Sequence, residues 1–201
     1  FMSTEQKILQ KTQQLFFRLG IKSVTMDDIA QELGMSKKTL YKFVDNKSDL
    51  VYKVLQNHLK EEQEFIETLE NLQVNAIDVI VEIIKHVINS LSNMPLSTLY
   101  DLQKYYPKSW ALVEDFKSCV IVETMENILK KGKKENLFRK EIKEDLISKF
   151  YMISIEGIMN PFNFTTYKNY DFKDIYLEYI VYHLHGIVSD KGHEYLKTIK
   201  L

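Results

Sequence analysis

The chain has 201 residues, of which 45% are hydrophobic and 27% charged, with only 6 Gly and 3 Pro. Few helix breakers, and many Lys, Glu, Leu and Ile residues, indicate an all-α fold, and no alternating run of β-branched residues predicts a strand. The single cysteine, Cys119, excludes an internal disulfide and is compatible with a reducing, cytoplasmic environment.

The charges are unevenly distributed, although the formal net charge is only −1. Residues 1–60 contain ten Lys/Arg and six Asp/Glu, a net +4, so the remainder carries −5. A basic N-terminal segment on an acidic body suggests an anionic partner at that end, although a difference of this size also arises by chance.

The most apolar stretch, residues 76–88, is interrupted by ionisable side chains at Asp78, Glu82, Lys85 and His86. It is too short and too charged to span a bilayer. The N-terminus is polar almost from its start, so no signal peptide is expected. We therefore expect a cytoplasmic protein with no membrane partner.

The first helix is expected to open at Ser3, because Gln6 follows three residues later with the spacing of a capping box. Apolar residues then recur at helical spacing from Ile8 to Leu19. Gly20 is placed to end the helix, where a left-handed residue is favoured.

Two short helices are predicted to follow. Thr25 can cap a helix that Gly34 ends. Ser36 can cap a third helix over residues 37–44, and the short connection gives a helix-turn-helix arrangement. Leu40 would face the core of this arrangement, leaving a polar face formed by Lys37, Lys38, Thr39 and Lys42.

A fourth helix is expected to begin at an Asn46 cap, which places Lys47 in its first turn. A cation there opposes the helix dipole. Its position is favourable if an external anion binds, since helix N-termini attract phosphate. Thr25 lies at a similar helix start.

The stretch SVTMDDIAQELGMSKKTLYKFVDNKSDL, residues 23–50, resembles the DNA-binding segment of the tetracycline-repressor (TetR) family of transcriptional regulators. The resemblance lies in Thr25, in IAQELG, in S-x-x-TLY, and in NK followed by an acidic residue and Leu, with no gap in their spacing. Val44 departs from the pattern, since many members carry Phe there, so altered packing is expected. The rest of the chain resembles the family only in length and helical character.

The resemblance implies roles for the polar residues of this segment. The third helix would enter the major groove, where lysine suits guanine O6 and N7 and a Thr methyl can meet thymine. Base contacts are expected from Lys37, Lys38 and Thr39, and phosphate contacts, which fix register, from Thr25, Tyr41, Lys42 and Lys47. The full predicted DNA-binding set is Thr25, Ser36, Lys37, Lys38, Thr39, Tyr41, Lys42 and Lys47. The alternatives are solvated charges for the lysines and core packing for Tyr41.

Beyond residue 47 the pattern predicts a long fourth helix, with apolar residues at helical spacing from Leu50 to Leu69 and a packed His58 among them. Further helices are expected over residues 76–91, 96–105, 107–131, 144–159 and 172–188, with a stop at Gly132 and an aromatic loop over 160–171. We therefore predict two domains: a helix-turn-helix DNA-binding domain, residues 1–47, and a helical ligand-binding and dimerisation domain, residues 48–201.

The segments 144–159 and 172–188 are apolar around more than one face, which indicates burial on more than one side. Packing within one subunit explains part of this, and the resemblance favours a four-helix interface in a homodimer for the rest. Two DNA-binding heads related by a two-fold axis would match a palindromic double-stranded operator. The candidate dimerisation residues are Phe150, Ile153, Gly157, Tyr176, Tyr179 and Ile180.

The inner helices are expected to enclose a pocket for an unknown small-molecule ligand, mixing apolar walls with a few polar groups. The candidate ligand-binding residues are His86, Tyr100, Tyr106, Trp110, Cys119 and Met125. Ordinary core packing is the alternative for each of them.

The leading hypothesis is a DNA-binding repressor that a ligand releases from its operator. The alternatives are a DNA-binding, architectural protein without an inducer, and an enzyme. The sequence has no Gly-rich phosphate loop, no H-E-x-x-H motif and no cysteine pair. His183 and His185 are two residues apart and would point apart on a helix. No catalytic residue, metal or cofactor is therefore expected.

Overall fold

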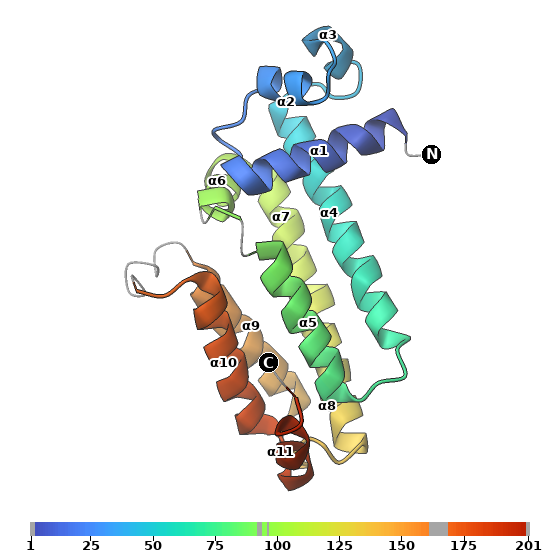
Figure 1. Cartoon of the computed structure of the whole chain (residues 1–201), viewed down its shortest axis with the longest axis vertical. Helices are drawn as coiled ribbons and strands as arrows, with labels where there is room; N and C mark the ends of the chain where they lie inside the picture. The colour runs from blue at the N-terminus through green and yellow to red at the C-terminus, as the bar shows by residue number, and fades with distance from the viewer. Residues whose placement is uncertain (1–2, 92–93, 96, 161–168, 200–201) are drawn as a thin grey trace. The chain divides into compact units, whose positions relative to one another are not determined.

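A computed structural model describes residues 3–91, 94–95, 97–160 and 169–199. Over these ranges the fold is all-α, as predicted, apart from one isolated bridge between Phe138 and Val188. The helices, drawn in Figure 1, are α1 (Thr4–Leu19), α2 (Met26–Glu32), α3 (Lys37–Leu40), α4 (Lys47–Glu70), α5 (Ala76–Leu91), α6 (Ser97–Tyr105), α7 (Pro107–Asp115), the π-helix η1 (Phe116–Ile121), α8 (Val122–Lys134), α9 (Glu144–Met159), α10 (Phe172–Ile187) and α11 (Asp190–Leu196). The predicted helix start at Leu96 and residues 161–168 of the predicted loop lie outside the described residues.

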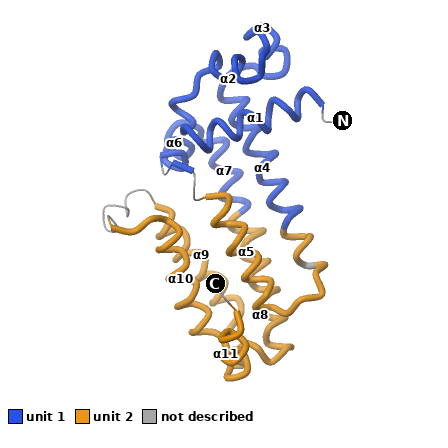
Figure 2. The backbone as a smooth tube through the Cα atoms, in the orientation of Figure 1, with its two compact units in different colours: residues 1–65, 93–116 blue, residues 66–92, 117–201 orange. Residues whose placement is uncertain are grey.

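The chain divides into two compact units, coloured separately in Figure 2. The first unit comprises residues 1–65 and 93–116, and the second comprises residues 66–92 and 117–201. Helices α6 and α7 thus belong to the same unit as α1, α2 and α3. The predicted division into functional domains at residue 47 stays a prediction.

The first three helices begin at the predicted capping residues. Ser3 and Gln6 form a capping box at α1, and Thr25 and Ser36 accept backbone N–H groups at the starts of α2 and α3. Gly20 has φ 82° and Gly34 has φ 62°, the left-handed region in which glycine is favoured over residues with a Cβ.

The third helix is shorter than predicted, since α3 ends at Leu40 and residues 41–43 form a turn. In this turn the Lys42 N–H donates to Thr39 and the Phe43 N–H donates to Leu40, each three residues back. The tighter winding leaves Phe43 half-buried and Val44 buried in the core. The predicted extension of the helix to residue 44 was wrong.

The core of the first unit joins the N-terminal helices to α4 and α6. Ile8, Leu40, Leu50 and Leu102 are all buried in this one cluster. His58 of α4 packs beside it as predicted, with its ring centroid 5.0 Å from that of Phe17 in an edge-to-face arrangement. His58 Nδ1 lies 3.3 Å from the Gln13 side-chain nitrogen.

In the second unit, α8 packs against α5 and α9, and α10 packs against α9 and α5. The segment after α8 is tied to the end of α10, because the Arg139 N–H donates to Ile187 and the Ser189 N–H donates to Leu137, both at 2.9 Å. These two hydrogen bonds lie on either side of the isolated bridge between Phe138 and Val188, and they hold the C-terminal end of α10 against the segment after α8.

The predicted helix over 107–131 is interrupted by η1 and continues past its expected stop. Gly132 lies inside α8 and is buried. A Cβ on Gly132 would lie 2.1 Å from Cδ2 of Phe138, so the absence of a side chain lets Phe138 pack against the helix. Gly132 therefore permits a close side-chain approach and does not end the helix.

Candidate nucleic-acid interface

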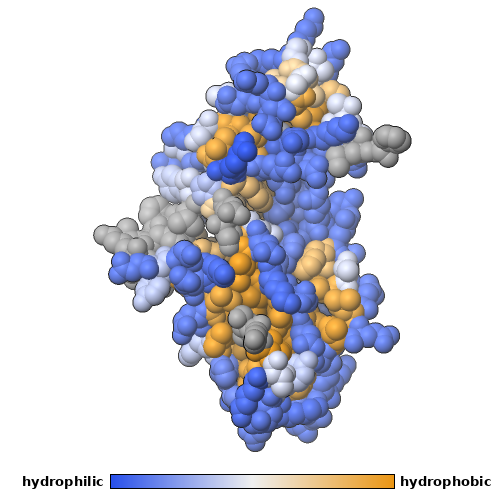
Figure 3. All heavy atoms as spheres, in the orientation of Figure 1, coloured by the Kyte–Doolittle hydropathy of each residue, from blue (hydrophilic) through white to orange (hydrophobic). Residues whose placement is uncertain are grey.

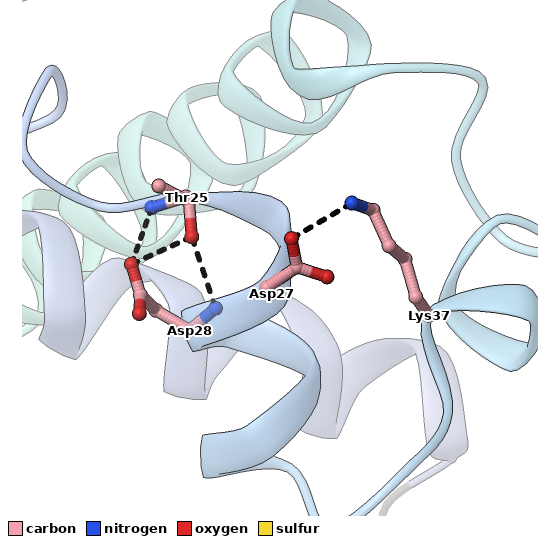
Figure 4. Close-up of polar contacts among 4 residues, drawn as sticks. All are labelled: Thr25, Asp27, Asp28 and Lys37. Carbon is pink, nitrogen blue, oxygen red and sulfur yellow. Dashed lines mark hydrogen bonds and ion pairs between the residues drawn. The ribbon is translucent and has the colours of Figure 1, made fainter.

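Thr25 and Asp28 form a reciprocal capping box at the start of α2 (Figure 4). The Thr25 backbone N–H donates to Asp28 Oδ2 at 2.8 Å, and the Thr25 hydroxyl donates to the same oxygen at 2.7 Å. The Asp28 N–H donates to Thr25 Oγ1 at 3.2 Å. These bonds lower the pKa of Asp28. Both donors of Thr25 are thus engaged, so a phosphate contact from its hydroxyl requires that Asp28 release it.

Ser36 and Thr39 are also joined to each other, with 2.8 Å between their hydroxyl oxygens. Lys37 extends away from α3, and its Nζ donates to Asp27 Oδ2 of α2 at 2.8 Å (Figure 4). This hydrogen bond raises the pKa of Lys37. This pair was not predicted from the sequence, because ten residues separate its members.

Lys38, Tyr41 and Lys42 form an exposed polar surface on and directly after α3. Tyr41 is 43% exposed, so its ring is not part of the core. Lys38 and Lys42 are exposed, and their side chains form no hydrogen bond or ion pair with another residue in the described ranges. The two unpaired lysine ammonium groups and the Tyr41 hydroxyl can therefore bind phosphates or the edges of bases.

Lys47 occupies a different environment from the other predicted DNA-binding lysines. It is half-buried, and its Nζ lies 3.5 Å from the Lys22 carbonyl oxygen. Burial lowers the pKa of Lys47, and the nearby carboxylates of Asp101 and Asp28 act in the opposite direction. Because its ammonium group has three N–H donors, Lys47 can keep this contact and still donate to a phosphate.

The six candidate ligand-binding residues are divided equally between the units. In the first unit, Tyr106 and Trp110 pack against the core, and the Tyr100 hydroxyl accepts from Lys104. In the second unit, His86 is half-buried, Cys119 is exposed on η1, and Met125 is buried beside a small cavity. Each unit holds three of the six, and their role in ligand binding stays a prediction.

The six candidate dimerisation residues fall into three pairs that differ in exposure. Phe150 and Ile153 are exposed on α9, at 56% and 65%, whereas Tyr176 and Ile180 are buried inside the second unit. Gly157 and Tyr179 are half-buried. Tyr182, which is not one of these six residues, is 76% exposed. On the face drawn in Figure 3, apolar residues also gather along α5 and α10.

The described residues contain no group of three or more His, Cys, Asp or Glu side chains that could hold a metal ion. Within the same ranges, no helix combines the length and the apolar character needed to cross a membrane.

Residues 8–54 match the family model described as "Bacterial regulatory proteins, tetR family". The chain is 27% identical over 132 residues to the uncharacterised HTH-type transcriptional regulator YvaF of Bacillus subtilis, which is 64% of this chain and 69% of that protein. It is 41% identical over 54 residues to the HTH-type transcriptional regulator SACOL2593 of Staphylococcus aureus, covering 27% of this chain and 29% of that one.

Solved structures show that the whole fold is shared more widely than the sequence. A TetR-family regulator from Agrobacterium tumefaciens aligns over 92% of this chain and 97% of its own, with a TM-score of 0.70 at 18% identity. The reduced form of NemR from Escherichia coli gives a TM-score of 0.73 at 12% identity, with the same coverage. A regulator from Saccharomonospora viridis, solved in complex with choline, gives a TM-score of 0.70 at 20% identity, again over 92% and 97% of the two chains.

Proposed function

Because the chain belongs to the TetR family of DNA-binding transcriptional regulators, we propose that it is a repressor released from its operator by a small molecule. The family is one of regulators and not of enzymes. In this proposal, residues 1–47 bind DNA in the cytoplasm, and residues 48–201 bind the ligand and form the dimer. The choline complex of the Saccharomonospora viridis regulator supports a small-molecule effector.

The observation that carries the proposal is the exposed surface formed by Lys38, Tyr41 and Lys42. A short capped helix followed by a tight turn presents these side chains, while Leu40 anchors the same segment in the core. Lys38 and Thr39 would then reach base edges, and Tyr41 and Lys42 would contact phosphates.

DNA binding through this surface can be tested with two matched lysine variants, using a duplex selected by the wild-type protein. Lys42→Ala should reduce the slope of log affinity against log salt by about 1.8 for the dimer, because each subunit loses one phosphate contact and each contact releases about 0.9 counterions. Lys38→Ala should reduce the preference for the selected sequence over random DNA. Lys60→Ala removes an exposed lysine in the middle of α4 and should change neither quantity. Equal effects from all three substitutions would argue against the assignment.

A homodimer is proposed to form through the exposed apolar residues of α9 and α10. Phe150, Ile153 and Tyr182 expose large apolar surfaces that a partner subunit can bury. Ile153→Asp should shift the sedimentation coefficient from that of a dimer to that of a monomer. Leu72→Asp, at an exposed apolar position outside both helices, is the control and should leave the dimer intact. Wild-type protein that sediments as a monomer at micromolar concentration would refute this interface.

Ligand release requires that the effector bind one conformational state better than another. The ligand would favour a state in which the two DNA-binding heads of the dimer no longer fit successive grooves of a palindromic operator. The coupling is measurable as a ligand-dependent loss of operator affinity.

A further inference from the structure

A cluster of aromatic and polar side chains lies inside the second unit, where α9 and α10 face each other. The ring centroid of His183 is 5.7 Å from that of Tyr151 and 5.7 Å from that of Tyr179. The rings of Tyr151 and Tyr179 are 6.2 Å apart. Tyr176 lies on α10, two turns before His183, and is 1% exposed. None of these residues belongs to the DNA-binding set predicted from the sequence.

Two polar atoms in this cluster are buried without a hydrogen-bond partner in the described part of the chain: the Tyr176 hydroxyl and His183 Nε2. Burial raises the pKa of Tyr176 to about 12, and the nearby Tyr151 hydroxyl acts in the opposite direction, but no hydrogen bond of normal geometry joins the two groups. An unpaired buried donor or acceptor destabilises the folded state, and protein interiors rarely contain one. Two such atoms beside the same cavity indicate a missing polar partner.

The cavity beside these atoms has a volume of about 10 Å³, room for at most one water molecule. Among the residues that the structure describes, no charged side chain lines it. The lining residues are Ile80, Ile83, Ile84, Met125, Tyr151, Tyr176, Ile180, His183 and Leu184. A larger occupant therefore has to displace part of the wall. Met125 is suited to give way, because methionine is unbranched and has three rotatable side-chain bonds.

The chemistry of the lining restricts what can bind. Burial lowers the pKa of His183 to about 4, so its imidazole is neutral at physiological pH and offers no charge to an anion. A cation would likewise find no carboxylate among the lining residues. The aromatic rings favour a flat apolar body, and the two unpaired polar atoms favour a hydrogen-bonding substituent on it.

We propose that Tyr176 and His183 form the polar end of the effector site, and that it takes a small, neutral, planar molecule with a hydrogen-bonding group. This inference rests on the ligand response proposed above. The residues proposed here differ from most of the ligand-binding candidates that were predicted from the sequence. Met125 is common to both sets.

Phenol and toluene are suitable probes, because they differ only in a hydroxyl or a methyl group on the same ring. Added to the full-length protein, phenol should raise the melting temperature in a saturable way, and more than toluene does. Tyr176→Phe should weaken phenol binding about tenfold, as expected for the loss of one hydrogen bond in a buried site. Without phenol, this variant should melt no lower than wild type, because the substitution removes an unpaired hydroxyl.

Two further variants keep the test specific. His183→Leu should also weaken phenol binding, whereas Tyr182→Phe, at an exposed position of the same helix, should not change it. No saturable effect of phenol on wild type, or equal phenol affinity in wild type and Tyr176→Phe, would overturn the site. Operator affinity measured without phenol separates the two proposals. If the protein binds its operator but phenol does not bind the protein, only the proposed effector site is wrong. If the protein does not bind an operator, the proposed repressor function is refuted.

Discussion

The buried imidazole of His183 predicts that the second unit loses stability in mild acid. Its pKa falls from 6.5 in the unfolded chain to about 4 in the folded one, because burial disfavours the charged form. Below pH 6.5 the unfolded chain therefore binds a proton that the folded chain takes up only near pH 4, so acid favours unfolding in that window. For one such site, the free energy of unfolding decreases by up to about 2.5 kcal/mol between pH 7.5 and 4.5. This is an upper bound, because His183 is only partly buried.

The assay is urea denaturation followed by circular dichroism at both pH values, with the protein concentration fixed because dimer formation would affect the midpoint. His183→Gln should lose less stability than wild type on acidification. His185→Gln, which replaces an exposed histidine of the same helix, should behave as wild type does. Identical pH dependence in wild type and His183→Gln would show that His183 is not held neutral by burial.

Two other substitutions test the local packing. Thr25→Ala removes the N-cap of α2 and should reduce the free energy of unfolding by about 1 kcal/mol, measured by denaturant titration, whereas Thr25→Ser should retain most of it. Gly132→Ala places a Cβ against Phe138 and should destabilise the protein by about 1–3 kcal/mol. Gly186→Ala is the control, because nothing lies within 4 Å of its new Cβ, and it should be neutral or stabilising. Equal melting temperatures for the two glycine variants would contradict the packing at Gly132.

The helix starts of the N-terminal segment, residues 1–47, were largely predictable from the sequence, because each depends on residues that are close together in the chain. A cap at Ser3, Thr25 or Ser36 depends on the residue itself and on the backbone three positions later. The structure confirms those three helix starts and the inward position of Leu40. The end of α3 was not predictable in the same way, since the apolar spacing of Leu40 and Phe43 suits both a helix and a tight turn.

The remaining errors involve contacts between residues distant in sequence. Gly132 has the appearance of a helix stop, and only the position of the Phe138 ring shows that it lies inside α8. The environment of Lys47 depends on the Lys22 carbonyl, 25 residues away. Likewise, the apolar pattern of α10 shows that Tyr176 and His183 are inward-facing candidates, but not that their polar atoms lack partners.

The most direct test of the central claim is to ask whether the purified protein selects double-stranded DNA from a random pool. We predict enrichment of a palindromic sequence whose half-sites lie about one helical turn apart. Affinity for it should fall steeply with salt, and the preference for it over random duplex should diminish in Lys38→Ala. A pool that shows no enrichment after repeated selection, even at low salt, would contradict the assignment of α3 and the turn after it as a DNA-binding surface.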